Sequence, residues 1–83
     1  MYKVIIEKRV LKDIENIPKD SFVKILNVIE ELACNPYPPN IKKLKGREAW
    51  RIRVGNYRII YQINNDELKI LIIKIGHRKD IYD

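Results

Sequence analysis

The sequence is poor in cysteine and histidine, with one residue of each, and it has no long apolar run. Its single cysteine, Cys34, cannot form an internal disulfide, which favours a reducing compartment. One histidine and scattered acidic residues cannot close a metal site, so we expect no metal and no other cofactor. Without a bilayer-spanning run, a signal peptide or a lipidation motif, the protein is expected to be cytoplasmic and to have no membrane partner.

The chain has 83 residues, a length that predicts a single domain over residues 1–83. Its composition, 46% hydrophobic and 34% charged, is typical of a globular protein and argues against a disordered one. Seventeen Lys and Arg residues against eleven Asp and Glu residues give a net charge of +6, which indicates a negatively charged partner such as nucleic acid. The excess lies in the second half of the chain, which holds Lys42, Lys43, Lys45, Arg47, Arg51, Arg53, Arg58, Lys69, Lys74, Arg78 and Lys79.

The first half of the chain reads as a strand followed by two helices. A strand is expected at 2–6, and the apolar spacing over 8–15 fits a short amphipathic helix that ends at Ile17-Pro18. Asp20 or Ser21 is the expected N-cap of a second helix, which Asn35-Pro36 ends. One stripe of this helix is predicted to cover a sheet, and it holds Phe22, Ile25, Leu26, Ile29, Leu32 and Ala33.

The second half reads as strands. The proline-rich segment 35–40 favours an extended connection, and 41–47 leads from it into a β-hairpin formed by 49–54 and 57–63. A near-continuous apolar run over 68–75 predicts a central strand. The expected fold is therefore α+β, with the N-terminal strand and helical hairpin packed on a mostly antiparallel four-stranded sheet in the order β-α-α-β-β-β.

Counting outward from a two-residue Gly55-Asn56 loop gives the register of the hairpin, with Val54 opposite Tyr57, Arg53 opposite Arg58, Ile52 opposite Ile59 and Arg51 opposite Ile60. Arg51, Arg53 and Arg58 then share one face of the sheet (the arginine face). Like charges side by side oppose folding, which suggests a ligand whose phosphate groups neutralise them; arginines extending separately into water are the alternative. The aromatic residues on the opposite face are assigned to the core, namely Trp50, Tyr57 and Tyr61.

The last strand is expected to place Ile63 opposite Leu68, which puts Lys69, Leu71, Ile73, Ile75 and His77 on the arginine face. The C-terminal segment would then bring a polar group to one edge of that face, consisting of His77, Arg78, Lys79 and Tyr82.

Three segments carry a resemblance to a known family: Lys-Leu-Lys-Gly at 43–46, Tyr-Arg-Ile-Ile-Tyr at 57–61, and Gly-His-Arg-Lys-Asp-Ile-Tyr at 76–82. Over essentially its whole length the chain resembles the RelE toxins of the RelE/ParE superfamily. The resemblance implies the toxin of a type II toxin–antitoxin system, a metal-independent endoribonuclease that cuts mRNA on the ribosome and stops translation. It also implies a cognate RelB-like antitoxin as a partner.

The resemblance assigns roles residue by residue. Arg58 and Arg78 match phosphate-binding and catalytic arginines, and Tyr82 matches a tyrosine that stacks on the substrate base. Arg51 and Arg53 stand where well-known members have functional lysines, one of which is thought to be the general base. Because arginine is a poor proton acceptor, His77 becomes the first candidate for the base, with Glu48 and Lys79 as alternatives. The basic residues expected to bind RNA are Arg51, Arg53, Lys79, Lys43 and Lys45. Steering toward ribosomal RNA is expected of Lys42, Lys43, Lys45 and Arg47, with a solvated basic loop as the alternative.

Two other functions remain open from the sequence. One is a ParE-like toxin that inhibits DNA gyrase, although such toxins generally lack the basic set formed by Arg58, Arg78 and the C-terminal Tyr82. The other is a noncatalytic basic module that binds nucleic acid by charge, for which +6 would suffice.

Overall fold

The computed structural model of the chain describes residues 1–79. Its elements are β1 (Lys3–Ile6), α1 (Val10–Glu15), α2 (Lys19–Cys34), β2 (Ile41–Lys43), β3 (Trp50–Val54), β4 (Tyr57–Asn64) and β5 (Lys69–His77). Within the described part of the chain, no helix has both the length and the apolar character needed to cross a membrane.

One mixed sheet holds all five strands in the order β1-β5-β4-β3-β2. The β1 strand pairs with β5 in parallel, and the other neighbours are antiparallel, so the predicted α+β class and the mostly antiparallel sheet are confirmed. The predicted count of four strands is one too low. The fifth strand is β2, whose three residues are too few to show an alternating pattern and which pairs with β3 at the sheet edge.

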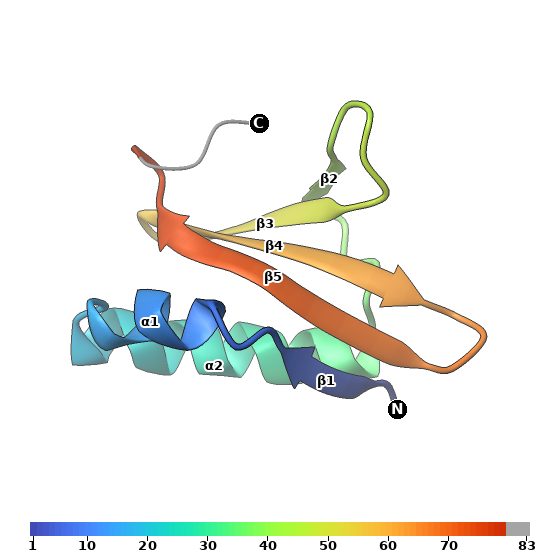
Figure 1. The fold of residues 1–83 in the computed structure, drawn as a ribbon, viewed down its shortest axis with the longest axis horizontal. Helices are drawn as coiled ribbons and strands as arrows, with labels where there is room; N and C mark the ends of the chain where they lie inside the picture. Colours follow the sequence, from blue (N-terminus) through green and yellow to red (C-terminus); the bar gives the residue numbers. More distant parts are fainter. Residues whose placement is uncertain (80–83) are drawn as a thin grey trace.

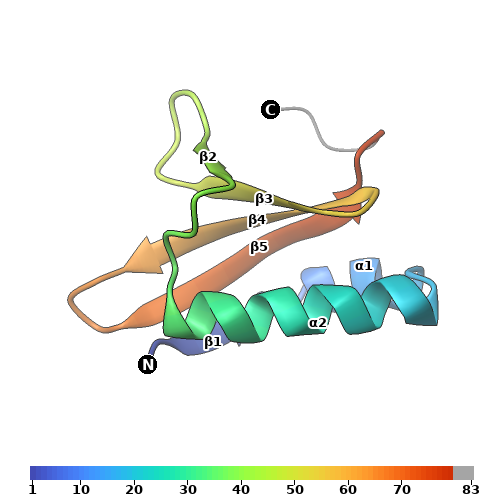
Figure 2. The same ribbon diagram turned by 180° about the vertical axis from the view of Figure 1, so that it is seen from behind.

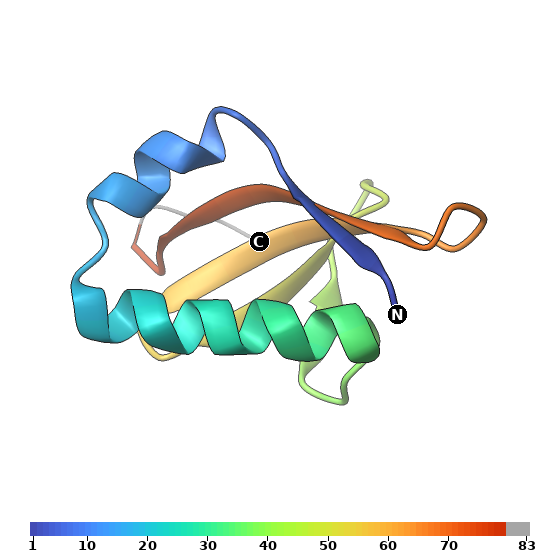
Figure 3. The ribbon, with the colours of Figure 1, turned by 90° about the horizontal axis from the view of Figure 1, so that it is seen from below.

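Both helices lie on one face of the sheet, as Figures 1 and 3 show. Helix α2 buries Ile25, Ile29, Leu32 and Ala33 there, which confirms most of the predicted stripe, whereas Leu26 remains 37% exposed. The fully buried core between helices and sheet also contains Val10, Ile59, Tyr61, Ile70, Ile72 and Ile75.

Helix α2 begins earlier than the sequence suggested. Pro18 occupies the N-cap position without a side-chain hydrogen bond, and its carbonyl oxygen accepts the first helical bond from the Phe22 N–H at 2.9 Å. The expected Asp20 or Ser21 cap is therefore wrong. Proline fits just before a helix because it has no N–H to leave unsatisfied, and Asp20 in the first turn suits the positive end of the helix dipole.

The β3–β4 connection is the two-residue loop expected from Gly55 and Asn56. Gly55 has φ +60° and Asn56 has a negative φ. A positive φ at the first loop residue alone is typical of a type II′ turn. The four predicted cross-strand pairs of the hairpin are all observed.

A second, smaller apolar cluster lies on the face that the helices leave uncovered. The β2–β3 loop extends on that side (Figure 1) and packs Leu44 and Ala49 against Ile60 and Ile73. The Leu44 N–H donates to the Ala49 carbonyl at 3.0 Å and holds the loop in this position. One part of the face is thereby covered by the protein itself.

Tyr61 ties the proline-rich connection to the sheet. Its buried hydroxyl donates to the Pro36 carbonyl oxygen at 2.9 Å, and burial, followed by the nearby Tyr37 hydroxyl, raises the pKa of Tyr61. The Tyr37 ring contacts Trp50 edge to face, with ring centroids 5.8 Å apart. These contacts support the predicted core positions of Trp50 and Tyr61.

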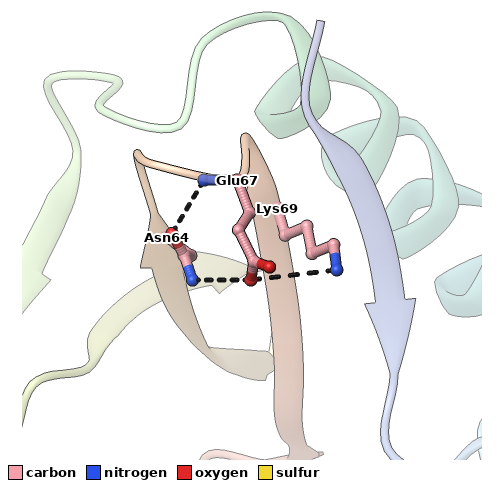
Figure 4. Close-up of polar contacts among 3 residues, drawn as sticks. All are labelled: Asn64, Glu67 and Lys69. Atoms are coloured by element: carbon pink, nitrogen blue, oxygen red, sulfur yellow. Dashed lines mark hydrogen bonds and ion pairs between the residues drawn. The ribbon is translucent and has the colours of Figure 1, made fainter.

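The β4–β5 connection is a four-residue turn that aligns Asn64 with Lys69 and Ile63 with Ile70, so the predicted Ile63–Leu68 pair is wrong. Asn64 accepts from the Glu67 N–H at 3.0 Å and donates to the Glu67 carboxylate at 3.1 Å. That carboxylate also lies 3.8 Å from the Lys69 ammonium, as Figure 4 shows. The turn therefore neutralises the first basic residue of β5.

Candidate functional site

The arginine face is the sheet face opposite the helices. Arg51 and Arg53 lie on β3 and Arg58 on β4, and the Cα of Arg53 pairs directly with that of Arg58. Their shared face follows from strand alternation, because the alternate residues Ile52 and Ile59 are buried in the helix-side core. The predicted convergence of these three arginines is confirmed.

These arginines differ in their exposure. Arg51 is only 7% exposed, Arg58 is half-buried and Arg53 is exposed. Burial, followed by the charges of Arg53 and Arg58, lowers the pKa of the Arg51 guanidinium. The group nevertheless remains a cation at neutral pH, since an arginine ionises far above it. The structure thus holds a partly desolvated positive charge beside two others.

Arg78 belongs to the same end of the sheet. Its backbone N–H donates to the Asn56 carbonyl at 2.8 Å, which places the residue after β5 beside the β3–β4 turn. Figure 2 shows this turn and the end of β5 together at one end of the sheet. Lys79 is exposed there, whereas Tyr82 lies outside the described residues.

His77 does not lie on the arginine face. The register shifts between Ile60 and Tyr61, so that Ile60 pairs with Lys74 but Tyr61 pairs with Ile72. Ile73 is the extra residue of a β-bulge, and beyond it the alternation of β5 is reversed. The expected placement of Ile75 and His77 on the arginine face is therefore wrong.

After the bulge, His77 pairs with Tyr57 on the helix side of the sheet. The two rings meet edge to face with centroids 5.5 Å apart, and the imidazole Nδ1 accepts from the Lys79 N–H at 3.3 Å. The contact with Tyr57 and the hydrogen bond from the Lys79 backbone therefore hold the His77 ring in this position. The predicted Lys69, Leu71 and Ile73 positions on the arginine face, which precede the reversal, are confirmed.

The same bulge brings Lys74 to the arginine face, a position that the sequence reasoning missed. Lys74 is exposed and lies directly opposite Ile60, which in turn lies opposite Arg51. The sequence did contain an indication that Lys74 lies on this face. A charged residue inside an apolar strand has to lie on the open face, and Lys74 is an odd number of residues from Lys69, so both can share a face only across a bulge.

The basic residues around β2 are divided between the two faces. Lys42 pairs with Arg51 and so lies on the arginine face. Lys43 pairs with Trp50 on the helix side, where its ammonium is 5.9 Å from the indole centroid and 3.5 Å from the Glu48 carboxylate. The structure therefore brings Lys42, rather than the predicted Lys43, to the arginines. Lys45 is exposed in the β2–β3 loop.

The opposite end of the arginine face has a different character. An open hollow of about 800 Å³ lies there, and three of its lining residues are acidic, namely Glu48, Asp66 and Glu67. Lys69 also lines this hollow and pairs with Glu67, so the face carries charges of both signs near the β4–β5 turn and is basic at the β3–β4 turn. Within residues 1–79, no group of three potential ligands among His, Cys, Asp and Glu is placed to hold a metal ion.

The basic end has the chemistry of a phosphate site. Guanidinium groups donate paired hydrogen bonds to phosphate oxygens, and preplaced cations stabilise negative charge that develops on them. A polyanion lying over this end would offset the repulsion between Arg53 and Arg58.

Comparison with known proteins shows the family to which the chain belongs. Residues 4–82 match the family model described as the ParE toxin of the type II toxin-antitoxin system, parDE. A putative toxin RelE1 of Methanocaldococcus jannaschii is 40% identical over 85 residues, which cover 98% of this chain and 94% of that protein.

Solved structures of RelE toxins are also similar to this chain. The RelE–RelB complex of Pyrococcus horikoshii contains a chain that matches with a TM-score of 0.84 and 31% identity, over 96% of this chain and 98% of that one. A RelB–RelE antitoxin–toxin complex from Methanococcus jannaschii matches with a TM-score of 0.77 and 36% identity, over 95% of each chain. The chain therefore belongs to the ParE toxin family of type II toxin–antitoxin systems, as a RelE-like toxin.

Proposed function

We propose that this RelE-like toxin stops translation by cutting mRNA in the decoding site of the ribosome. The observation that carries the proposal is the placement of Arg53 directly opposite Arg58, with the buried Arg51 beside them. Three guanidinium groups on one face fit a phosphodiester backbone, and the names of the relatives fit a toxin.

The reaction needs no cofactor in this proposal. The 2′-oxygen of the RNA attacks the adjacent phosphorus, the bond from phosphorus to the 5′-oxygen breaks, and the 2′-hydroxyl proton passes to a base. A second proton reaches the departing 5′-oxygen, so the products are a 2′,3′-cyclic phosphate and a 5′-hydroxyl. Arg58 and Arg78 stabilise the charge on the nonbridging oxygens more in the transition state than in the ground state.

Arg51 and Arg53 act through charge alone in this scheme, because a guanidinium rarely gives up its proton. Among the candidate bases, Glu48 is paired with Lys43, and His77 contacts Tyr57 on the helix side. Lys79 is exposed next to Arg78 at the basic end of the sheet. Lys79 is therefore the described residue that we propose as proton acceptor, acting as its neutral amine because an ammonium cannot accept a proton. Tyr82 keeps its proposed role of stacking on the base.

We also propose a cognate RelB-like antitoxin as partner, acting in the cytoplasm. The Pyrococcus and Methanococcus neighbours are both complexes of RelE with RelB. An acidic antitoxin segment over the arginine face would neutralise the same charges as RNA and so exclude it. The helices offer exposed apolar side chains for further contacts, namely Leu11, Val23 and Leu26.

Gyrase inhibition is the second candidate function, because the matching family model is that of a ParE toxin. It needs protein contacts rather than a phosphate site, and it gives no role to the convergent arginines. The third candidate, a noncatalytic basic module, needs only the net charge of +6.

Purified toxin mixed with programmed ribosomes tests the proposal. We expect a cut within the decoding site, with a cyclic phosphate on one product and a 5′-hydroxyl on the other. A supercoiling assay with gyrase runs in parallel. Inhibition of supercoiling with intact mRNA would favour the ParE-like function, and salt-sensitive binding to RNA without either activity would favour the basic module.

A further inference from the structure

We infer that the scissile phosphate of the RNA rests against the backbone of Gly76, between the guanidinium groups of Arg58 and Arg78. This inference rests on the proposed nuclease function. It adds a substrate-positioning residue that acts by having no side chain, and it names the part of the basic end at which the reacting group lies.

Gly76 lies on the arginine face at its open, basic end. Its Cα pairs with that of Arg58 on β4. The preceding residue, Ile75, is buried in the helix-side core, so strand alternation directs position 76 to the opposite face. The β2–β3 loop packs farther along this face, against Ile60 and Ile73, and Gly76 keeps part of its surface exposed to solvent. A ligand can therefore reach it.

Cationic residues flank Gly76 on three sides. Arg58 lies directly across on β4, and Lys74 and Arg78 lie two residues before and after Gly76, about 7 Å away along the strand. Both of these residues are exposed. The hydrogen bond from the Arg78 N–H to the Asn56 carbonyl continues the ladder past the end of β5, so alternation brings Arg78 to the face of Gly76. The position without a side chain is thus enclosed by positive charge.

The backbone of β5 does not require a glycine at this position. Gly46 and Gly55 have positive φ angles of 68° and 60°, which favour glycine, whereas Gly76 has a negative φ. The extra residue of the bulge is Ile73, so the bulge does not require Gly76 either. A glycine inside a strand lowers stability and often marks the close approach of a ligand. Any side chain here would fill the space between the three cations, which glycine leaves to an anion.

Glycine provides space at this position rather than a hydrogen-bond donor. Since the Arg78 N–H points to Asn56, directly before β4, alternation directs the Gly76 N–H toward β4 as well, where the strand ladder uses it. Arg58 and Arg78 can then approach the nonbridging oxygens from two sides, and Lys74 adds a third charge. Preplaced cations of this kind stabilise the charge that develops on those oxygens in the transition state.

The test measures stability and cleavage together in full-length Gly76→Ala, Gly76→Val and Gly46→Ala. Urea denaturation gives the stability. Single-turnover cleavage of mRNA on programmed ribosomes, at varied toxin concentration, gives the maximal rate and the half-saturating concentration. Gly46→Ala is the matched control, because its φ of 68° favours glycine and an added methyl group would meet no atom within 4 Å.

We expect opposite results at the two glycines. Gly76→Ala should raise the urea midpoint, because alanine restricts the unfolded chain and accepts a negative φ, and should nevertheless lower the maximal rate. Gly76→Val should lower that rate about 100-fold, the loss that a misplacement of about 1 Å can cause. The half-saturating concentration should change little, since the rest of the RNA and the ribosome still bind. Gly46→Ala should lower the urea midpoint and, while folded, cleave as wild type does.

A second measurement needs no ribosome. Inorganic phosphate is titrated into isotope-labelled wild type at constant ionic strength, with chloride as the reference anion, and the amide signals are followed by NMR. We expect the amide signals of Gly76 and Arg78 to move together and to saturate. In Gly76→Val, the amide signal of Arg78 should stay in place.

Wild-type cleavage rates in both Gly76 variants would overturn the inference, as would a Gly76 amide signal that phosphate does not move. A loss of activity that only matches a loss of folded protein would assign the glycine a structural role and overturn it too. If wild type cuts mRNA in any of these cases, the Gly76 site alone is wrong. If phosphate binds at Gly76 but mRNA on ribosomes stays intact, the proposed function and the scissile phosphate both fail, and only an anion site remains.

Discussion

Arg53 lies directly opposite Arg58 across the β3–β4 hairpin, so the Cβ atoms of two cationic side chains are about 5 Å apart. A directly opposed pair of like charges destabilises a hairpin, and nothing in the packing of the helix-side core requires it. We interpret the pair as a feature retained for an anionic ligand at the expense of stability.

Replacing Arg53 by Gln should therefore stabilise the folded protein while it weakens RNA cleavage. Removal of the repulsion is expected to raise the free energy of unfolding by about 0.2 to 1 kcal/mol. Because salt screens exposed charges, the gain should shrink as ionic strength rises. Urea denaturation at low and high salt measures this effect. Lys24→Gln removes an equal charge away from the pair and should change stability less; a destabilised Arg53→Gln variant would refute the interpretation.

The new position of His77 leads to a second prediction. Because its ring packs on Tyr57 at the helix side, His77→Gln should lower the cleavage rate less than tenfold. The pH–rate profile should keep its shape, whereas loss of a general base would remove one of its inflections. Single-turnover rates between pH 5.5 and 8.5 decide between the two. A large loss together with a flattened profile would restore His77 to the mechanism.

Tyr61→Phe tests the link between the proline-rich connection and the sheet. The variant leaves the buried Pro36 carbonyl without its donor, which should cost about 1 to 3 kcal/mol of stability at pH 7. Chemical denaturation measures the loss. An unchanged stability would mean that this hydrogen bond contributes nothing to the fold.

The raised pKa of Tyr61 adds a pH dependence to that comparison. Above about pH 10 the unfolded chain ionises this tyrosine while the folded chain still keeps the proton, so the unfolded state binds fewer protons and stability falls as pH rises. The limiting slope is about 1.4 kcal/mol per pH unit. Tyr61→Phe lacks this term, so the two unfolding free energies should converge above pH 10. A constant gap between pH 9 and pH 11 would contradict the assigned burial effect.

The sequence predicted the hairpin well because its turn leaves little freedom. Gly55 and Asn56 allow a two-residue loop, and counting from it placed Arg51, Arg53 and Arg58 on one face, as observed. The strand β2 escaped prediction because three residues are too few to display alternation. Its existence depends on pairing with β3 across the connecting loop, which the local pattern of these three residues does not reveal.

The predicted register of β5 was wrong for a related reason. The apolar run around Ile70–Ile73 shows no alternation that would indicate which residues face the core. A bulge then moves every later residue of the strand to the opposite face of the sheet. His77 was thus assigned to the wrong face and Lys74 was overlooked. The polar Lys74 within the run was the one local indication of the bulge.

Single-turnover cleavage of mRNA on programmed ribosomes by Arg58→Ala is the most direct test of the central claim that the arginine face stabilises the RNA transition state. Arg58 lies directly opposite Arg53, and removal of one such donor should lower the rate constant about 100- to 1000-fold in a protein that remains folded. A loss of less than tenfold would contradict the claim.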